Sequence, residues 1–483
     1  MNKELRRVSI VVLLMFVALF GSSTVIQVFQ QDNLRADGRN ARTLYASFSA
    51  ERGPILVDGE PIAESVPVDD EYKFRRVYEH GPLYSAVTGY FTLNQGNTGV
   101  EGALNDYLSG TANEQFLDQL NAVITGQNPK GAAVELTIDP VVQKAAWDAL
   151  GSQKGAVIAI DPKTGAILAM VSKPTFDPGD LATHDPAKFK ETYDALIADD
   201  DNPLINRTIA GDLNPPGSTF KLVVTATALE NGLTPDTSFP NPPTLTLPQS
   251  TAVITNAEGG SCGGGATATI ATALRLSCNI PFAQLGLQLG YPAISQQARE
   301  FGFGDDGIRV PMRVEPSVYP PIASDAELML SSFGQASDRV SPLQMAMVSA
   351  AVANGGQLMK PTLIETIFAP DLTELQSFSP EVYSTPISAE TAATMTGMMI
   401  NNVSNGAGSN ARINGVDVAG KTGTAENGDG PYTLWFTGFA PANDPQVAVA
   451  VVVENGGGLG QSGFGNLIAA PIARTVMEAV LNR

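Results

Sequence analysis

An uncharged, mostly apolar run near the N-terminus constrains the fold and location of this chain more than any other feature. It covers residues 8–31, and Lys3, Arg6 and Arg7 lie just before it. About 20 apolar residues are enough to cross a bilayer as a helix. Because the basic residues precede the run, the positive-inside rule predicts that residues 1–7 stay in the cytoplasm. Everything after the run would then fold outside the membrane.

Two interpretations of this run are open. A cleaved secretory signal would share the basic start and the apolar core, but no Ala-x-Ala-like cleavage site follows here. We therefore expect a retained anchor over residues 8–31. No later segment is apolar for long enough to be a second span. Both interpretations export residues 32–483, and the first gives a single-pass protein of the plasma membrane.

Composition narrows the chemistry of the exported part. The chain has 483 residues and a net charge of −20. Such an acidic surface repels phosphate backbones, so we expect no nucleic-acid partner. His80 and His184 are the only two histidines. Zinc sites usually draw three or four His, Cys or carboxylate ligands at short spacing, and neither histidine has another His or a Cys near it, so we expect no metal and no cofactor. A Ser-His-Asp triad would have to use one of these two histidines, so a serine enzyme here would need another base.

The pattern of residues predicts a small domain followed by a large one. Residues 32–132 are polar and rich in turn signals such as Asp58-Gly59, which predicts an extracytoplasmic pedestal of mixed structure. In residues 133–483, strands are followed by helices, then by strands and a closing helix. That order predicts an α+β or α/β sandwich, with one mostly antiparallel sheet, helices on both faces and an all-helical subdomain. Strands are expected near 134–138, 156–160, 166–171, 434–440 and 446–454, and helices near 141–150, 221–230, 341–352 and 466–481.

Export also permits a disulfide. Cys262 and Cys278 are the only cysteines, and they lie 16 positions apart. A bridge that closes such a loop would stabilise the fold by about 3 kcal/mol, because it restricts the unfolded chain. We hypothesise that the two residues pair. The alternative is a pair of inert, buried thiols.

The segment Pro215-Pro-Gly-Ser-Thr-Phe-Lys221 carries the candidate nucleophile. Pro-Pro-Gly cannot continue a helix, whereas the residues after it can, so Ser218 should stand at a helix start. Ser218 and Lys221 would then lie one turn apart on one face. A lysine amine can remove the serine proton if burial lowers its pKa. The competing interpretation is an N-cap serine and an exposed lysine, although no other lysine has a serine three residues before it.

A second motif, Ser277-Cys278-Asn279, follows downstream. Its hydroxyl could relay protons, and its amide could both donate to and accept from a peptide substrate. On its own the motif is weak, because serine and asparagine are common in loops and helix caps.

The third motif, Lys421-Thr422-Gly423-Thr424, is expected on an edge strand. A cation and two hydroxyls there suit the carboxylate of an extended substrate laid beside the strand. Gly423 would let that substrate approach closely.

Taken in order, S-x-x-K, S-x-N and K-T-G form the motif set of penicillin-binding proteins and class A β-lactamases. The chain resembles a class B, monofunctional penicillin-binding protein, and in particular the actinobacterial penicillin-binding protein A group. Further likeness lies in Glu51-Arg-Gly-Pro-Ile55, Gly99-Val-Glu-Gly102 and Ser332-Phe-Gly-Gln335. The resemblance therefore runs nearly from end to end.

This resemblance implies a peptidoglycan D,D-transpeptidase that β-lactams acylate and inhibit. Ser218 would attack the penultimate D-Ala carbonyl of a stem peptide and release D-Ala, with Lys221 as general base. Ser277, together with Lys421, would pass a proton to the leaving amine. A second stem-peptide amine would then take the acyl group.

Substrate-binding roles follow from the same resemblance. Asn279 would hold the amide of the acyl chain, and Thr422 and Thr424 would bind the substrate carboxylate beside Gly423. The backbone N–H groups of Ser218 and Thr424 would form the oxyanion hole.

The resemblance also implies a partner. Only residues 32–132 separate the anchor from the catalytic domain, which leaves no room for the glycosyltransferase domain of bifunctional relatives. Glycan polymerisation would then need a SEDS-type membrane glycosyltransferase that contacts the anchor and pedestal. The rival hypotheses are a D,D-carboxypeptidase or β-lactamase-like hydrolase, a catalytically idle scaffold or β-lactam sensor, and a cell-surface binding module.

Three other features are interpreted as local structure. Lys163-Thr-Gly165 repeats the third motif but lies in a predicted hairpin turn. The segment 458–463 matches G-x-G-x-x-G, but no second strand follows to complete a dinucleotide-binding unit, so we expect a loop near the cleft. His184 is expected to be a solvated loop residue.

Overall fold

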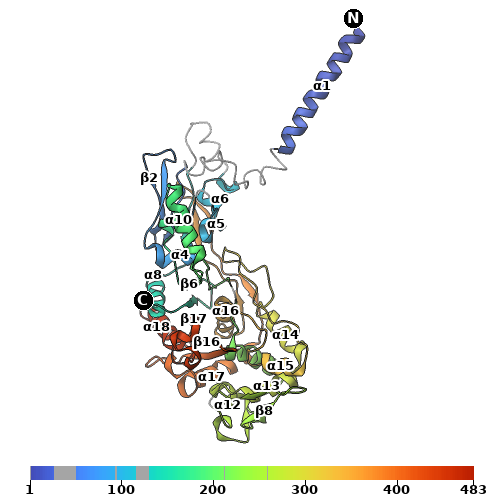
Figure 1. Cartoon of the computed structure of the whole chain (residues 1–483), viewed down its shortest axis with the longest axis vertical. Coiled ribbons are helices and arrows are strands. Elements are labelled where there is room, and N and C mark those ends of the chain that lie inside the picture. The colour runs from blue at the N-terminus through green and yellow to red at the C-terminus, as the bar shows by residue number, and fades with distance from the viewer. Residues whose placement is uncertain (1, 27–49, 93–94, 116–129, 212, 258) are drawn as a thin grey trace.

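The computed structural model describes the chain except for residues 1, 27–49, 93–94, 116–129, 212 and 258 (Figure 1). Helix α1 (Asn2–Thr24) stands apart from the folded body. Its segment Leu5–Thr24 is the only helix among the described residues that is long and apolar enough to cross a membrane, and none of it is buried in the protein. The last part of the predicted span, 27–31, lies outside the described residues.

A six-stranded sheet forms the centre of the smaller, pedestal part of the body. Its order is β13-β12-β4-β1-β2-β3, and only the β1–β4 pair is parallel. The turn Asp58-Gly59, with positive φ at both residues, joins β1 to β2 as a tight hairpin. The strands are β1 (Ile55–Val57), β2 (Glu60–Pro67), β3 (Phe74–Tyr78), β4 (Ala133–Leu136), β12 (Ile364–Phe368) and β13 (Glu374–Ser377). Since β4, β12 and β13 follow residue 132, the expected domain boundary at 132/133 falls inside this sheet.

A buried ion triad lies beneath the same sheet. The Glu101 carboxylate accepts from Arg52 Nε at 2.6 Å and from Arg76 Nε at 2.7 Å. All three side chains are buried. Burial alone would raise the pKa of Glu101, but the charges of Arg76 and Arg52 outweigh it and lower the pKa. The short helices around the triad are α4 (Gly81–Thr88), α5 (Gly99–Ala103) and α6 (Asn105–Leu108).

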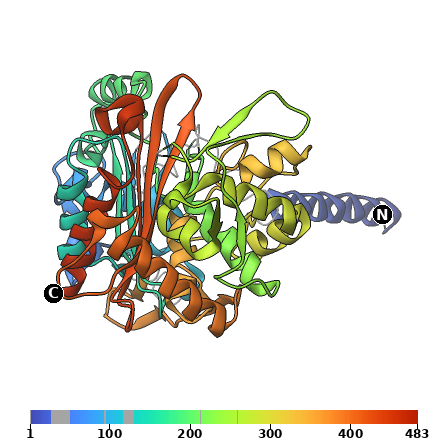
Figure 2. The same cartoon turned by 90° about the horizontal axis from the view of Figure 1, so that it is seen from below.

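A five-stranded antiparallel sheet forms the centre of the larger part, in the order β15-β16-β17-β5-β6. Alternate residues of β5 face two different cores: Ala156 and Ile158 face the side of α16, and Val157 and Ala159 face the side of α8 and α18. Figure 2 shows the helices on both sides of the sheet. The elements are β5 (Gly155–Ile160), β6 (Ile167–Lys173), β15 (Ala419–Asn427), β16 (Gly430–Ala440), β17 (Val447–Val453), α8 (Pro140–Leu150), α16 (Pro342–Ala353) and α18 (Ala469–Leu481). This confirms the predicted sandwich.

A mostly helical subdomain lies beside this sheet, at the end of the molecule away from the pedestal (Figure 1). Its helices are α11 (Lys221–Glu230), α12 (Ile270–Leu276), α13 (Asn279–Leu289), α14 (Tyr291–Glu300), α15 (Asp325–Ser331) and α17 (Ala389–Asn405). Two short strand pairs join them, which the all-helical prediction did not include: β7 (Ser238–Pro240) with β10 (Thr267–Thr269), and β8 (Thr244–Thr246) with β9 (Val253–Thr255). The α-helices and strands not yet named among the described residues are α9 (Pro178–Leu181), α10 (Pro186–Ala198), β11 (Leu358–Met359) and β14 (Val382–Ser384).

His184 lies in the loop between α9 and α10, as expected, but the expectation that it is solvated is wrong. Only 12% of its side chain is exposed, and Nδ1 lies 2.6 Å from Asp70 Oδ2. That hydrogen bond is the main reason why the pKa of Asp70 is lowered. The partner is distant in sequence, so no local pattern marks the contact. Lys163-Thr-Gly165, in contrast, occupies the turn between β5 and β6, as predicted.

Candidate active site

Ser218 lies in a single turn of 3₁₀ helix, η3 (Gly217–Phe220), which leads directly into α11. The prediction of a helix start at Ser218 is therefore confirmed. Gly217 has a φ of 52° and donates its N–H to Gly334 O at 2.9 Å. Trp435 Nε1 donates to Pro215 O at 2.9 Å. These bonds fix the turn, and Ser218 is partly exposed while Gly217 beside it is buried.

Strand β15, which carries the third motif, is an edge strand, as predicted. It packs closely against the turn of Ser218. A Cβ on Gly217 would lie 2.8 Å from Thr424 O, and one on Gly423 would lie 2.9 Å from Pro216 O. The space that Gly423 leaves is thus filled by the nucleophile turn. The expectation that Gly423 lets substrate approach closely stays a prediction.

Lys221 lies at the centre of the site and is fully buried. Its Nζ donates to Ser277 O and to Asn279 Oδ1, each at 2.8 Å. No described carboxylate forms an ion pair with it. Burial, and next the charge of Lys421, hold the pKa of Lys221 well below its ordinary value. The competing interpretation of Lys221 as an exposed residue is excluded.

Ser277 connects the two lysines. It ends α12 in the left-handed conformation, with φ 61° and ψ 35°, which is rare for a residue other than glycine. Its Oγ accepts from Lys421 Nζ at 2.8 Å, and Lys421 Nζ also donates to Thr422 O at 2.8 Å. Lys421 is fully buried, and burial lowers its pKa to about 7. The structure thus brings Lys221, Ser277 and Lys421 together.

The hydrogen bonds of Lys221 suit its neutral form. A neutral amine has two N–H bonds and one lone pair, whereas an ammonium ion has no lone pair. Ser277 O and Asn279 Oδ1 can each accept one N–H. The neutral form is therefore satisfied by these two acceptors and keeps a lone pair that can take a proton.

Asn279 and the two threonines surround this centre. Asn279 Nδ2 donates to Thr255 O at 3.1 Å. Thr422 Oγ1 donates to Ala407 O at 3.3 Å, and Thr424 Oγ1 accepts from Gly465 N at 3.2 Å. Thr424 therefore keeps its hydroxyl proton available. Gly465 follows the 458–463 segment, so the expected glycine-rich loop does lie beside this motif.

Asn256 is a positioning residue that the sequence analysis missed. It is buried, and its Oδ1 accepts from the N–H groups of Asn279 at 2.9 Å and Ile280 at 3.1 Å. It therefore holds the start of α13, and with it Asn279. Asn256 and Asn279 are 23 positions apart, and no motif joins them.

The two cysteines are joined by a disulfide in the structure. Cys278 lies between Ser277 and Asn279 and is fully buried. The bridge ties the second motif to the loop before α12. The alternative of two free thiols does not describe this structure.

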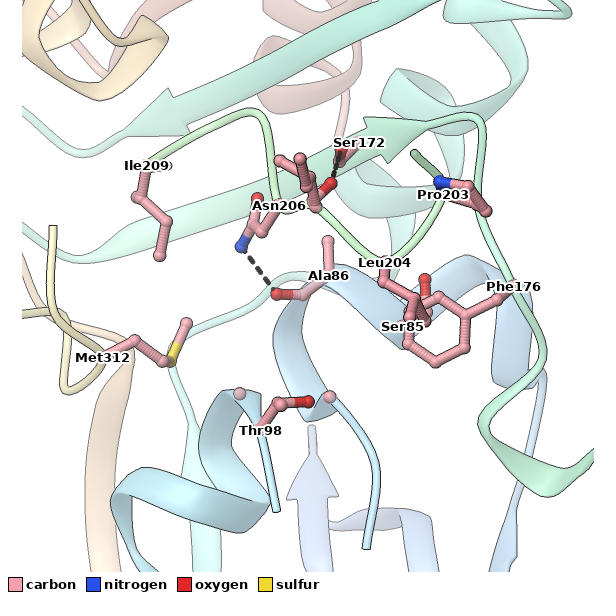
Figure 3. Close-up of a pocket in the computed structure, with 13 residues that line it drawn as sticks. Ser85, Ala86, Thr98, Ser172, Phe176, Pro203, Leu204, Asn206, Ile209 and Met312 are labelled. Atoms are coloured by element: carbon pink, nitrogen blue, oxygen red, sulfur yellow. Dashed lines mark hydrogen bonds between the residues drawn. The ribbon is translucent and has the colours of Figure 1, made fainter. Parts of the chain in front are cut away.

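Metal ligands are not gathered in the described part of the chain: it contains no group of three or more histidine, cysteine or acidic side chains. A small cavity lies elsewhere, between α4 and the segment 203–209 (Figure 3). Asn206 Nδ2 donates to Ala86 O across it at 2.7 Å. None of the residues that line this cavity is titratable.

Comparison with known families gives two matches. Residues 155–478 match the penicillin binding protein transpeptidase domain. Residues 52–134 match the penicillin binding protein A dimerisation domain. The peptidoglycan D,D-transpeptidase PbpA of Mycolicibacterium smegmatis is 41% identical over 492 residues, which cover 100% of this chain and 99% of that protein. The protein of the same name from Mycobacterium tuberculosis is 40% identical over 490 residues, with the same coverage.

Solved structures agree with these matches. The ceftriaxone acyl-enzyme complex of penicillin-binding protein A from M. tuberculosis superposes with a TM-score of 0.87 at 38% identity, and the match covers 90% of this chain and 100% of that one. The penicillin G acyl-enzyme complex of the same protein gives a TM-score of 0.84 and covers 89% and 100% of the two chains.

Proposed function

Because this chain belongs to the penicillin-binding protein transpeptidase family, we propose that it is a peptidoglycan D,D-transpeptidase with Ser218 as its nucleophile. The two mycobacterial relatives that carry this activity in their name match it along nearly its whole length. β-Lactams imitate the D-Ala-D-Ala end of the substrate and acylate the same serine. The proposal concerns the residues that perform each step.

Acylation begins at the turn of Ser218. Lys221 takes the Oγ proton while Oγ attacks the penultimate D-Ala carbonyl of a stem peptide. The carbonyl oxygen gains negative charge and is stabilised by the backbone N–H groups of Ser218 and Thr424. The intermediate collapses, the C–N bond breaks, and the acyl group remains on Ser218 as an ester.

The leaving D-Ala needs a proton on its nitrogen. Ser277 Oγ supplies it and is reprotonated by Lys421, whose Nζ lies 2.8 Å away. This role requires Lys421 to be an ammonium ion, and its pKa of about 7 keeps part of the population in that form near neutrality. Lys221 and Lys421 thus play opposite parts, one taking a proton and the other giving one.

Substrate is held beside β15. Thr424 donates its free hydroxyl proton to the terminal carboxylate, and Thr422 does so once it leaves Ala407 O. Asn279 holds the amide of the acyl chain. In the second half of the reaction, an amine of another stem peptide attacks the ester and loses its proton through Ser277 Oγ to Lys421, which gave up a proton during acylation. The C–O bond to Ser218 breaks, and Lys221 returns to Ser218 Oγ the proton that it took.

One observation carries this proposal: two fully buried lysines donate to the same residue, Lys221 to Ser277 O and Lys421 to Ser277 Oγ, with no described carboxylate to balance them. Buried lysines are rare unless they are paired. A structural purpose would be served better by apolar side chains of the same volume. Lysines buried there without counter-ions have lowered pKa values, so they can take and give protons near neutral pH.

Covalent labelling tests the proposal. The full chain is incubated with fluorescent penicillin and examined after denaturing electrophoresis. We expect durable label on the wild type and none on Ser218→Ala, while Ser250→Ala, at the exposed turn between β8 and β9, keeps the label. Label that persists in Ser218→Ala would identify a different nucleophile. A stem-peptide donor with an amine acceptor then distinguishes cross-linking from hydrolysis.

The setting of the enzyme is also part of the proposal. We place residues 1–7 in the cytoplasm, residues 8–31 across the plasma membrane, the pedestal at 32–132, and the transpeptidase domain at 133–483 outside. Glycan strands would come from a SEDS-type membrane glycosyltransferase bound through the anchor and pedestal. Replacing residues 8–31 by an unrelated span should weaken co-purification with that polymerase. Undiminished co-purification would argue against a role of the anchor.

A further inference from the structure

A second cavity, with a volume of about 460 Å³, opens beside the proposed active site. One wall is the end of α17 and the segment that follows it, up to residue 412. The other is the loop around Cys262 together with the last residues of α12, Arg275 and Leu276. A cavity of this size can hold a side chain or a small polar group of a ligand. Glu258 belongs to the same loop in sequence but lies outside the described residues, and the proposed site does not include it.

Three residues of the cavity wall touch or adjoin the residues proposed to bind substrate. Leu276 directly precedes Ser277 in the chain. Ala407 O accepts from Thr422 Oγ1 at 3.3 Å. The third is Asn256, whose Oδ1 accepts from Asn279 N. A peptide bound at the second and third motifs would therefore pass next to this cavity.

Two arginines, Arg275 and Arg412, line the cavity. Arg275 donates one N–H to Asn405 O at 2.7 Å, and Arg412 donates Nε–H to Ser409 O at 2.9 Å. Both acceptors are neutral backbone carbonyls. Neither arginine forms an ion pair with any residue in the described part of the chain. Each guanidinium thus keeps N–H donors available for an anion.

Among the described residues that line the cavity, the only charged side chains are these two arginines, whereas the whole protein is acidic. The chain has 49 acidic and 29 basic side chains and carries a net charge of −20. An anionic ligand is repelled by such a surface, unless a local positive site receives it. Arginine is also the side chain whose planar fork best fits a carboxylate. The cavity therefore has the charge, the donor geometry and the position to take an acidic group of the substrate.

We propose that this cavity is a subsite in which Arg275 and Arg412 bind a second carboxylate of the peptide substrate, distinct from the terminal carboxylate at Thr422 and Thr424. This inference rests on the proposed transpeptidase function and adds a preference for acidic peptides. The carboxylate could belong to the donor peptide or to the acceptor peptide, and the experiment separates the two.

The test changes the substrate first. Full-length chain in detergent reacts with a pair of D-Ala-D-Ala donor peptides that differ only in a side-chain carboxylate or its neutral amide, on a residue before D-Ala-D-Ala. A second pair of peptides carries the same change on the amine acceptor. We expect the wild type to favour the carboxylate form by about 10-fold in at least one pair, because the neutral amide loses the charge-assisted hydrogen bonds to the guanidinium groups. A 10-fold preference corresponds to about 1.4 kcal/mol. The affected pair identifies the peptide that occupies the cavity.

Variants then locate the effect. Arg412→Gln should abolish the preference, and Arg412→Lys should restore part of it, because a positive charge returns without the planar fork. Arg309→Gln is the matched control, since Arg309 is also exposed and donates to backbone carbonyls of its own loop. It should keep the preference. Each rate is normalised to the fraction of chain that fluorescent penicillin can label.

The outcomes separate the two proposals. A wild type that penicillin labels but that treats carboxylate and amide peptides alike would overturn the subsite and leave the transpeptidase function intact. A preference that survives in Arg412→Gln and in Arg275→Gln would also overturn it. A folded wild type that penicillin does not label would overturn the function, and the subsite with it.

Discussion

The pedestal and the active site each bury a cluster of ionisable side chains, but only the cluster in the pedestal contains both charges. In the pedestal, Glu101 lies between Arg52 and Arg76, and its pKa is lowered by their charges. In the active site, Lys221 and Lys421 share Ser277 and face no described carboxylate, and burial lowers both of their pKa values.

Whether a buried charged group has a counter-ion decides whether it can exchange protons near neutral pH. A charge with a counter-ion keeps its ordinary protonation state across neutral pH, so it can hold strands and helices together but cannot exchange protons. A buried amine without a counter-ion is held near the point of losing its proton. A buried ion pair such as that of Glu101 therefore stabilises the fold but takes no part in proton transfer. Buried lysines without a counter-ion lower the stability of the fold but can transfer protons.

Replacing Lys221 by methionine should show the largest effect. The variant loses its general base, so we expect penicillin acylation to slow by about 10²–10⁴-fold. Its midpoint of thermal unfolding should not fall, because an unpaired buried amine is exchanged for an apolar side chain of similar length. Stopped-flow acylation and calorimetry measure the two effects. A large fall in thermal stability would show that Lys221 is a structural residue.

Glu101→Gln should have the reverse effect. It leaves Arg52 and Arg76 buried without a counter-ion, which should lower the free energy of unfolding by about 3–5 kcal/mol. The folded fraction should still react with penicillin, since Glu101 touches none of the three motifs. Denaturant unfolding and labelling of the same sample check this. A variant as stable as the wild type would contradict the role given to the triad.

Lys421→Met should stabilise the fold by a smaller amount that depends on pH. Lys421 binds fewer protons in the folded state, because its pKa is about 7 there. The stability of the wild type should therefore rise with pH from about 7 towards the ordinary lysine pKa near 10.4. At pH 7 the variant should gain about 1–4 kcal/mol, and the gain should shrink by pH 9. A gain that does not change with pH would mean that Lys421 has an ordinary pKa.

An exposed pair should show almost no effect. Lys360 Nζ lies 2.6 Å from Glu381 Oε1, but half or more of each side chain is exposed. Solvent screens such pairs, so Lys360→Ala should change the free energy of unfolding by less than about 1 kcal/mol. Denaturant unfolding at two salt concentrations checks this. A cost as large as that of Glu101→Gln would remove burial as the explanation of the contrast.

The sequence indicated the motif residues more readily than the residues that hold them in position. Ser218, Lys221, Ser277 and Lys421 could be proposed because their motifs depend on short spacings, and central strands such as β5 and β17 could be predicted because they are short, continuous apolar runs. Asn256 could not be found, because its hydrogen bonds to the start of α13 join distant parts of the chain. A contact of that kind has no periodic signal.

Two further contacts could not be predicted, for the same reason. Strands β12 and β13 come from beyond residue 360 and complete the pedestal sheet, so the chain crosses between the domains in a way that composition does not reveal. Gly423 was assigned to the substrate because it stands in the third motif. The structure shows that its missing Cβ also admits the turn of Ser218, a contact between segments about 200 positions apart.

The pH dependence of acylation tests the central claim most directly, because it reports whether two unpaired buried lysines move the protons. The second-order rate with penicillin is measured from pH 5 to pH 9.5 on the wild type. We expect this rate to give a bell-shaped profile against pH. The acid limb reflects protonation of Lys221, and the alkaline limb, with a midpoint at about pH 7, reflects loss of the proton from Lys421. A rate that stays level from pH 6 to pH 9.5 would contradict the account, since neither lysine would then change its charge in the range where the chemistry needs it.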